Sequence, residues 1–153
     1  MLNNGDKAPD FMLPRDGGET VKLSQFKGKP VVVFFYPKDD TSGCTREAVE
    51  FSAQLDAFHR AGAEVLGISP DSIKSHGKFR DKYGLTVMLL SDEDKQTLEA
   101  YGVWVEKSMY GRKYMGVERS TFIIGKNGKI LRSWRKVKVP GHVDEVLAAV
   151  QEL

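Results

Sequence analysis

The sequence predicts an α/β fold in which a central mixed β-sheet is flanked by helices. Three observations support this prediction. Short runs of β-branched and aromatic residues alternate with longer segments in which apolar residues recur three or four positions apart, as in strands and amphipathic helices. The pair Asn127-Gly128 separates two further apolar runs and predicts a hairpin. The chain has 153 residues, 41% of them hydrophobic, which suits a single domain over residues 1–153.

The N-terminal part is expected to form a small hairpin followed by a buried strand. Short apolar pieces at 11–13 and 21–23 can pair across the turn Asp16-Gly17-Gly18. The run VVVFFY at 31–36 is too short for a typical helix and is closed by Pro37, as expected of a strand buried on both faces. This strand should lie at the centre of the sheet.

A helix is expected to follow over residues 43–60. Four apolar residues fall three or four positions apart and so share one helical face: Ala48, Phe51, Leu55 and Phe58. Gly62 supplies a C-terminal stop.

The rest of the chain continues the alternation and ends in an antiparallel hairpin and a helix. In chain order we expect a strand at 64–69, a helix at 71–84, a strand at 86–92, a helix at 93–102, a polar and aromatic loop at 103–116, two paired strands at 120–125 and 130–134, and a helix at 143–153. Asp71 or Ser72 can cap the helix at 71–84, and Ser91 or Asp92 the next one. A thioredoxin-like α/β sandwich fits this order.

Composition and charge exclude several classes of partner. Lys and Arg number 23 against 21 Asp and Glu, so the formal net charge of +2 does not draw the chain to nucleic acid. The basic stretch 126–138 is interpreted as the solvated face of a hairpin, because alternation along 130–134 points the charges outward. The N-terminal residues lack the pattern of a secretory leader, and no run of about 18 apolar residues predicts a membrane span. A soluble, cytoplasmic protein is expected.

The only cysteine, Cys44, stands where the strand at 31–36 gives way to the helix that follows. Unpaired N–H groups and the positive end of the helix dipole favour the thiolate there. A buried hydrophobe is the alternative interpretation of a lone cysteine, but the neighbours Ser42, Gly43 and Thr45 form a polar turn. The position therefore predicts a nucleophile, and a single Cys persists as a free thiol most readily in a reducing cytosol.

The spacing Pro37-x-x-x-Thr41-x-x-Cys44 resembles the active-site signature of the peroxiredoxins, thiol peroxidases on a thioredoxin fold. Residues 5–45 and 108–130 are similar to the bacterioferritin comigratory protein (peroxiredoxin Q) subfamily. The resemblance implies that the Cys44 thiolate attacks the peroxide O–O bond, with Thr41 and Arg119 as pocket donors, Glu47 holding Arg119, and Pro37 as a shield. A guanidinium suits this role because it stabilises both the thiolate and the negative charge on the leaving oxygen.

Two departures from the subfamily alter the expected mechanism. Val49 stands where many members carry a resolving cysteine, and Ser42 stands where Pro usually precedes Gly-Cys. No internal disulfide can form, so we expect a one-cysteine cycle in which a Cys44 sulfenic acid is recycled by an external thiol, namely thioredoxin, glutaredoxin or glutathione. A sulfenic acid without a nearby partner is also expected to overoxidise more easily.

The sequence leaves alternatives open for the function, for the segment 103–116 and for association. A redox-sensing interaction protein, switched by Cys44 oxidation, is an alternative to the peroxidase. The segment 103–116 can line the peroxide pocket or pack against a partner chain, and a monomer or weak homodimer is expected. No cofactor is expected, and no metal, because three histidines lie far apart in the sequence: His59, His76 and His142.

Overall fold

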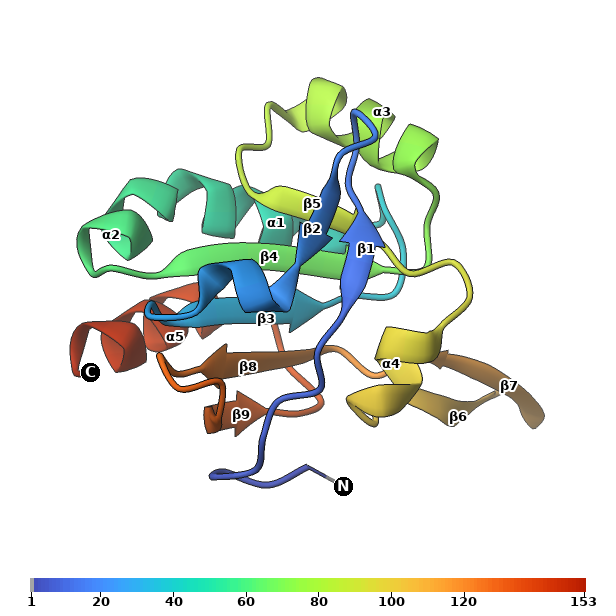
Figure 1. Cartoon of the computed structure of the whole chain (residues 1–153). Helices are drawn as coiled ribbons and strands as arrows, with labels where there is room; N and C mark the ends of the chain where they lie inside the picture. Colours follow the sequence, from blue (N-terminus) through green and yellow to red (C-terminus); the bar gives the residue numbers. More distant parts are fainter. Residues whose placement is uncertain (1) are drawn as a thin grey trace.

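The computed structural model describes residues 2–153 and is built on a five-stranded sheet in the order β5-β4-β3-β8-β9 (Figure 1). The strands are β3 (Val31–Phe35), β4 (Glu64–Ser69), β5 (Met88–Ser91), β8 (Ser120–Ile124) and β9 (Ile130–Trp134). β3, β4 and β5 run parallel, whereas β8 and β9 are antiparallel to their neighbours. The predicted mixed sheet is confirmed, with β3 at its centre.

Every residue of β3 is buried because both faces of the sheet are covered. Val31, Val33 and Phe35 pack with the N-terminal elements and α4, while Val32 and Phe34 pack with the other helices. The first layer contains β1 (Met12–Pro14), β2 (Thr20–Lys22), the 3-10 helix η1 (Leu23–Phe26) and α4 (Gln96–Ala100). The second contains α1 (Ser42–Ala53), α2 (Leu55–Arg60), α3 (Ile73–Tyr83) and α5 (His142–Gln151). The flanked α/β sandwich expected from the sequence is confirmed.

Helix α3 begins and ends at the residues that the sequence indicates, whereas α4 has Lys95 at its N-cap instead of the expected Ser91 or Asp92. Ser72 caps α3 by accepting a hydrogen bond from the Ser75 amide at 3.1 Å, and Gly84 ends the helix in the left-handed region at φ 63°. The Asp92 carboxylate accepts from the Leu98 amide at 2.8 Å, but α4 itself begins at Gln96, three residues later than predicted. Among residues 2–153, none of the helices is both long and apolar enough to cross a membrane.

The single helix predicted over 43–60 is wrong in one respect, since the structure divides it at Gln54. That residue has φ −100° and ψ 6°, outside helical geometry, and separates α1 from α2. Phe51 and Phe58 nevertheless reach the same core, because the two helices cover one face of the sheet. The apolar spacing therefore predicts the buried face correctly but does not predict the break at Gln54.

The prediction of a loop over 103–116 is also wrong, because this segment forms a second hairpin. β6 (Trp104–Met109) pairs antiparallel with β7 (Arg112–Val117), outside the central sheet (Figure 1). The two turn residues, Tyr110 and Gly111, both have positive φ, 51° and 77°, as a tight hairpin turn requires. A tyrosine rarely occupies this region, so the sequence lacked the Asn-Gly signal that announced the β8–β9 hairpin.

Substitution of Gly67 by alanine is predicted to destabilise the fold. A Cβ atom at this position of β4 would lie 2.6 Å from Cζ of Phe34, whose ring is stacked on Phe51 at 4.5 Å between centroids. Displacing a packed core ring is expected to cost about 1–3 kcal/mol in the free energy of unfolding measured by urea denaturation. Gly77→Ala is the matched control, because no atom lies within 4 Å of its Cβ position. Equal stabilities of the two variants would contradict the prediction.

Candidate active site

Cys44 lies in the first turn of α1, whose N-cap residue is Thr41. Only 1% of the Cys44 surface is exposed. Among residues 2–153 no side chain caps this helix, and the Thr41 hydroxyl donates to the Lys38 carbonyl at 2.9 Å. The N–H groups of the first turn therefore remain free to stabilise a thiolate or a bound oxygen.

The sheet order brings Arg119 to the same end of the fold as Cys44. Phe35, the last residue of β3, pairs with Ser120, the first residue of the antiparallel strand β8. Arg119 immediately precedes β8 and therefore lies beside the point where the chain leaves β3 for α1. Two residues that are 75 positions apart in the sequence are thus neighbours in the structure.

The guanidinium of Arg119 joins the sulfur to a carboxylate. Its Nη2 donates to Cys44 Sγ at 3.1 Å, and its Nη1 donates to Glu47 Oε1 at 2.8 Å. Glu47 lies one helical turn after Cys44 and is fully buried. The structure therefore brings together three of the five residues that the sequence predicted for the site, in an arrangement that supports a thiolate.

Burial raises the pKa of Glu47 to about 7, although the Arg119 charge and hydrogen bond oppose the shift. Its Oε2 atom has no hydrogen-bond partner among the described residues. A buried carboxylate with one unpaired oxygen costs free energy. The role of Glu47 in orienting the Arg119 guanidinium stays a prediction.

Gly43 belongs to the site but was not among the residues predicted for it. A Cβ atom there would lie 3.2 Å from Arg119 Nη2, so the guanidinium packs directly against the backbone of the first turn. A side chain at position 43 would crowd the contact with Cys44. The signal in the sequence was a glycine immediately before the cysteine.

The remaining predicted residues lie in the loop that connects β3 to α1. Thr41 is exposed and Pro37 is partly buried. The Thr41 hydroxyl donates its hydrogen to the Lys38 carbonyl, so the lone pairs of the Thr41 oxygen remain available as acceptors. The pocket role of Thr41 and the shielding role of Pro37 stay predictions.

The hairpin β6–β7 lines a cavity of about 470 Å³ that also includes Arg119. Lys107 of β6 is on the wall of this cavity, and burial together with the Arg119 charge lowers its pKa. Its aliphatic stem passes close to Gly116 of β7. The segment therefore lines a cavity beside Arg119, but Cys44 is not among the residues that line it. Whether the segment faces the peroxide or a partner chain stays a prediction.

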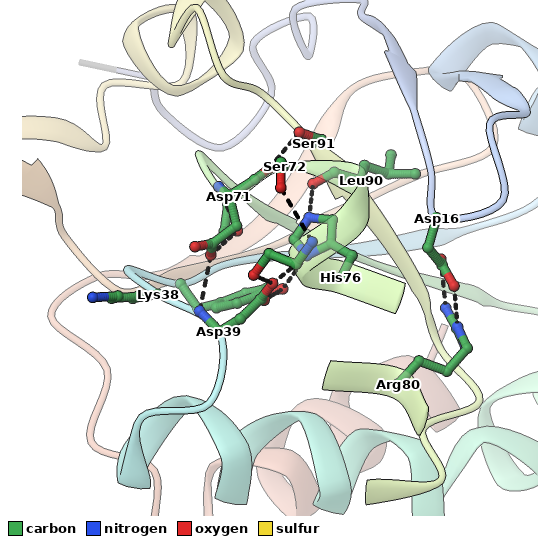
Figure 2. A network of polar contacts seen from close by, with 12 residues as sticks. Asp16, Lys38, Asp39, Asp71, Ser72, His76, Arg80, Leu90 and Ser91 are labelled. Carbon is green, nitrogen blue, oxygen red and sulfur yellow. Dashed lines mark hydrogen bonds and ion pairs between the residues drawn. The ribbon is translucent and has the colours of Figure 1, made fainter. Parts of the chain in front are cut away.

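The structure also contains a polar cluster, close to the site, that the sequence did not predict. Asp39, Asp71 and His76 come from separate segments, and one potential ligand atom of each lies within 4.8 Å of the others (Figure 2). Both ring nitrogens of His76 already contact protein acceptors, Asp39 and the Leu90 carbonyl. The donor set is of a kind that binds metal, but the ring nitrogens are committed to these hydrogen bonds.

The raised pKa of Glu47 predicts that stability falls as the pH rises from about 4.5 to about 7. In this window the folded state retains a proton that the unfolded state has released, so raising the pH favours unfolding, by roughly 3 kcal/mol at most. Urea denaturation at both ends of the window should show this loss in the wild type and a smaller loss in Glu47→Gln, which cannot titrate. The same pH dependence in both proteins would contradict the assignment.

Comparison with known proteins is consistent with this geometry. Residues 4–133 match the AhpC/TSA family. Peroxiredoxin Bcp of Bacillus subtilis is 49% identical over 149 residues, which cover 97% of this chain and 95% of that protein. Peroxiredoxin Bcp of Escherichia coli is 44% identical over 151 residues, covering 99% of this chain and 97% of that protein.

Solved structures give the same result. A structure of Xanthomonas campestris peroxiredoxin Q superposes with a TM-score of 0.91 at 44% identity, covering 99% of this chain and 96% of that one. A second, of the bacterioferritin comigratory protein of Xanthomonas campestris, described for its alkyl peroxide reduction activity, gives 0.91 at 43% identity, covering 99% and 97%. The resemblance seen in the sequence is confirmed: the chain belongs to the AhpC/TSA family and is a peroxiredoxin of the bacterioferritin comigratory protein type, a thiol-dependent peroxidase.

Proposed function

We propose that this peroxidase reduces hydrogen peroxide and small organic hydroperoxides by a one-cysteine cycle at Cys44. The observation that supports this most directly is the Arg119 contact, in which one guanidinium nitrogen lies 3.1 Å from Cys44 Sγ while the other is held by Glu47. The alkyl peroxide reduction described for the Xanthomonas campestris relative supports organic hydroperoxides as a substrate class.

In the first step the Cys44 thiolate attacks one peroxide oxygen. An S–O bond forms and the O–O bond breaks, which gives a sulfenic acid and, after protonation, water or an alcohol. Arg119 stabilises the thiolate before the attack and the charge on the leaving oxygen during it. Thr41 is expected from the sequence to donate to the peroxide, but its hydroxyl donates to the Lys38 carbonyl, so we propose that it accepts a hydrogen bond from the peroxide instead. Pro37 limits the access of water.

In the second step an external thiol attacks the sulfenic sulfur, releases water and leaves a mixed disulfide, which a second thiol reduces. The sequence contains no other cysteine, so both thiols come from outside the chain. Thioredoxin, glutaredoxin and glutathione are the reductants that fit this chemistry. No internal partner competes with further oxidation, so high peroxide should convert Cys44 to the sulfinic acid.

We further propose that residues 1–153 act as one domain, as a monomer or weak homodimer, in the cytoplasm. A reducing compartment keeps a lone thiol available for catalysis. Met109 and Tyr110 at the tip of the β6–β7 hairpin are exposed, at 56% and 98%, and offer a small apolar contact for weak association.

Hydrogen peroxide loss with excess dithiothreitol tests the cycle. We expect many turnovers per wild-type chain and none for Cys44→Ser, because the only thiol is removed. Peptide mass after high peroxide should show two added oxygens on Cys44 of the wild type and none at the same position of Cys44→Ser; the methionines, which peroxide also oxidises, lie at other positions.

Consumption of about one peroxide per chain would contradict the peroxidase cycle. That result would favour a redox-sensing interaction protein, in which Cys44 oxidation is itself the signal.

A further inference from the structure

Side chains of helix α3 form hydrogen bonds with two consecutive aspartates of the catalytic loop. The loop between β3 and α1 contains Asp39 and Asp40, only a few residues before Cys44. Asp39 Oδ2 contacts His76 Nδ1 at 2.7 Å and accepts from Ser75 Oγ at 2.8 Å, both from the first part of α3. The loop that contains Thr41 and leads into α1 is therefore held by hydrogen bonds to α3.

The contact between His76 and Asp39 is buried and directional. His76 is fully buried and Asp39 is 7% exposed. His76 Nε2 lies 2.9 Å from the Leu90 carbonyl, which can only accept, so Nε2 carries a hydrogen (Figure 2). A second proton must then lie between Nδ1 and the Asp39 carboxylate, since two lone pairs would otherwise face each other at 2.7 Å. This contact is a short hydrogen bond between two buried groups, and a hydrogen bond in such a dry site is strong.

The groups around this pair complete the network. The Tyr36 hydroxyl donates to Asp39 Oδ1 at 2.6 Å, and burial together with the Asp39 charge raises the pKa of Tyr36 well above its usual value. The Asp39 amide donates to Asp71 Oδ2 at 2.8 Å, and Asp71 in turn accepts from Ser69 Oγ at 2.6 Å. Both the side chain and the backbone of Asp39 are therefore fixed.

The contacts that α3 makes with the neighbouring Asp40 are exposed to solvent and therefore weaker. Lys82 Nζ lies 2.8 Å from Asp40 Oδ2, and the Tyr83 hydroxyl donates to Oδ1 at 2.5 Å. Asp40 adopts φ 59°, a conformation that non-glycine residues adopt at a cost. An exposed ion pair contributes little to stability. Lys82 thus provides a control on the same helix and the same loop.

The one-cysteine cycle makes opposing demands on this loop. Attack on a small peroxide needs Cys44, Arg119 and the first turn of α1 in their closed arrangement. Reduction by an external thiol needs access to a sulfur whose residue is only 1% exposed. The loop must therefore be closed for one half-reaction and displaced for the other.

We propose that His76 is a positioning residue that acts through Asp39 to hold the catalytic loop closed. It supports the peroxide step and restrains the thiol step, so it sets the balance between the two half-reactions. This inference rests on the proposed one-cysteine cycle and assigns a role to a histidine outside the pocket.

Steady-state kinetics of His76→Gln separate the two steps, because kcat/KM for peroxide reports oxidation and kcat/KM for dithiothreitol reports reduction. We expect the first to fall and the second to rise, so that their ratio shifts by about tenfold, as loss of a buried hydrogen bond implies. Lys82→Met should leave the ratio within about twofold, because its pair is exposed. A general loss of structure would lower both parameters together.

A double-mutant cycle tests whether His76 acts through Asp39. Asp39→Asn should shift the ratio in the same direction, and His76→Gln should add nothing in that background. Additive effects, an unchanged ratio in His76→Gln, or a parallel fall of both parameters would overturn the inference. If either variant does not fold by circular dichroism, Ser75→Ala removes one donor to Asp39 and should shift the ratio by about fivefold.

Wild-type turnover with dithiothreitol tests the proposed function by itself. With that turnover established, an unchanged ratio in Ser75→Ala or His76→Gln would reject only the role of His76.

Discussion

The ion pair between Arg119 and Glu47, with the Cys44 sulfur on the same guanidinium, is the interaction on which the rest of the site depends. It requires β8 to lie antiparallel beside β3, since only that register places Arg119 next to the start of α1. It also requires Gly43, whose missing side chain leaves room for the guanidinium. The core of the sheet thus fixes the distance between two residues that are 75 positions apart.

The same arrangement places conflicting requirements on the molecule. A buried Glu47 with an oxygen that lacks a partner among residues 2–153 costs free energy, yet its other oxygen accepts a hydrogen bond from Arg119. A buried Cys44 is protected from solvent, yet a one-cysteine peroxidase must expose its sulfenic acid to a thiol. The buried contact between Asp39 and His76 lies where these requirements meet, because it ties the loop before α1 to a helix that takes no part in the chemistry.

Much of the fold could be predicted because its signals are local. The apolar run before Pro37, the cap at Ser72 and the Asn-Gly turn each act within a few residues. The turn at Tyr110 and Gly111 escaped prediction because a tyrosine with positive φ carries no local signal. Family resemblance, rather than spacing, identified Arg119, and nothing in the sequence linked Asp39 to His76, 37 residues away, since that contact exists only once α3 packs beside the loop.

The most direct test of this account is the second-order rate constant for oxidation of Cys44 by hydrogen peroxide in Arg119→Lys. Lysine keeps the charge but cannot bridge sulfur and carboxylate with two nitrogens, so we expect the rate constant to fall by about 100-fold or more. Arg112→Lys, an exposed position on the adjacent hairpin, should react as the wild type does. A wild-type rate constant in Arg119→Lys would contradict the account, because it would show that the fixed guanidinium is not what makes Cys44 reactive.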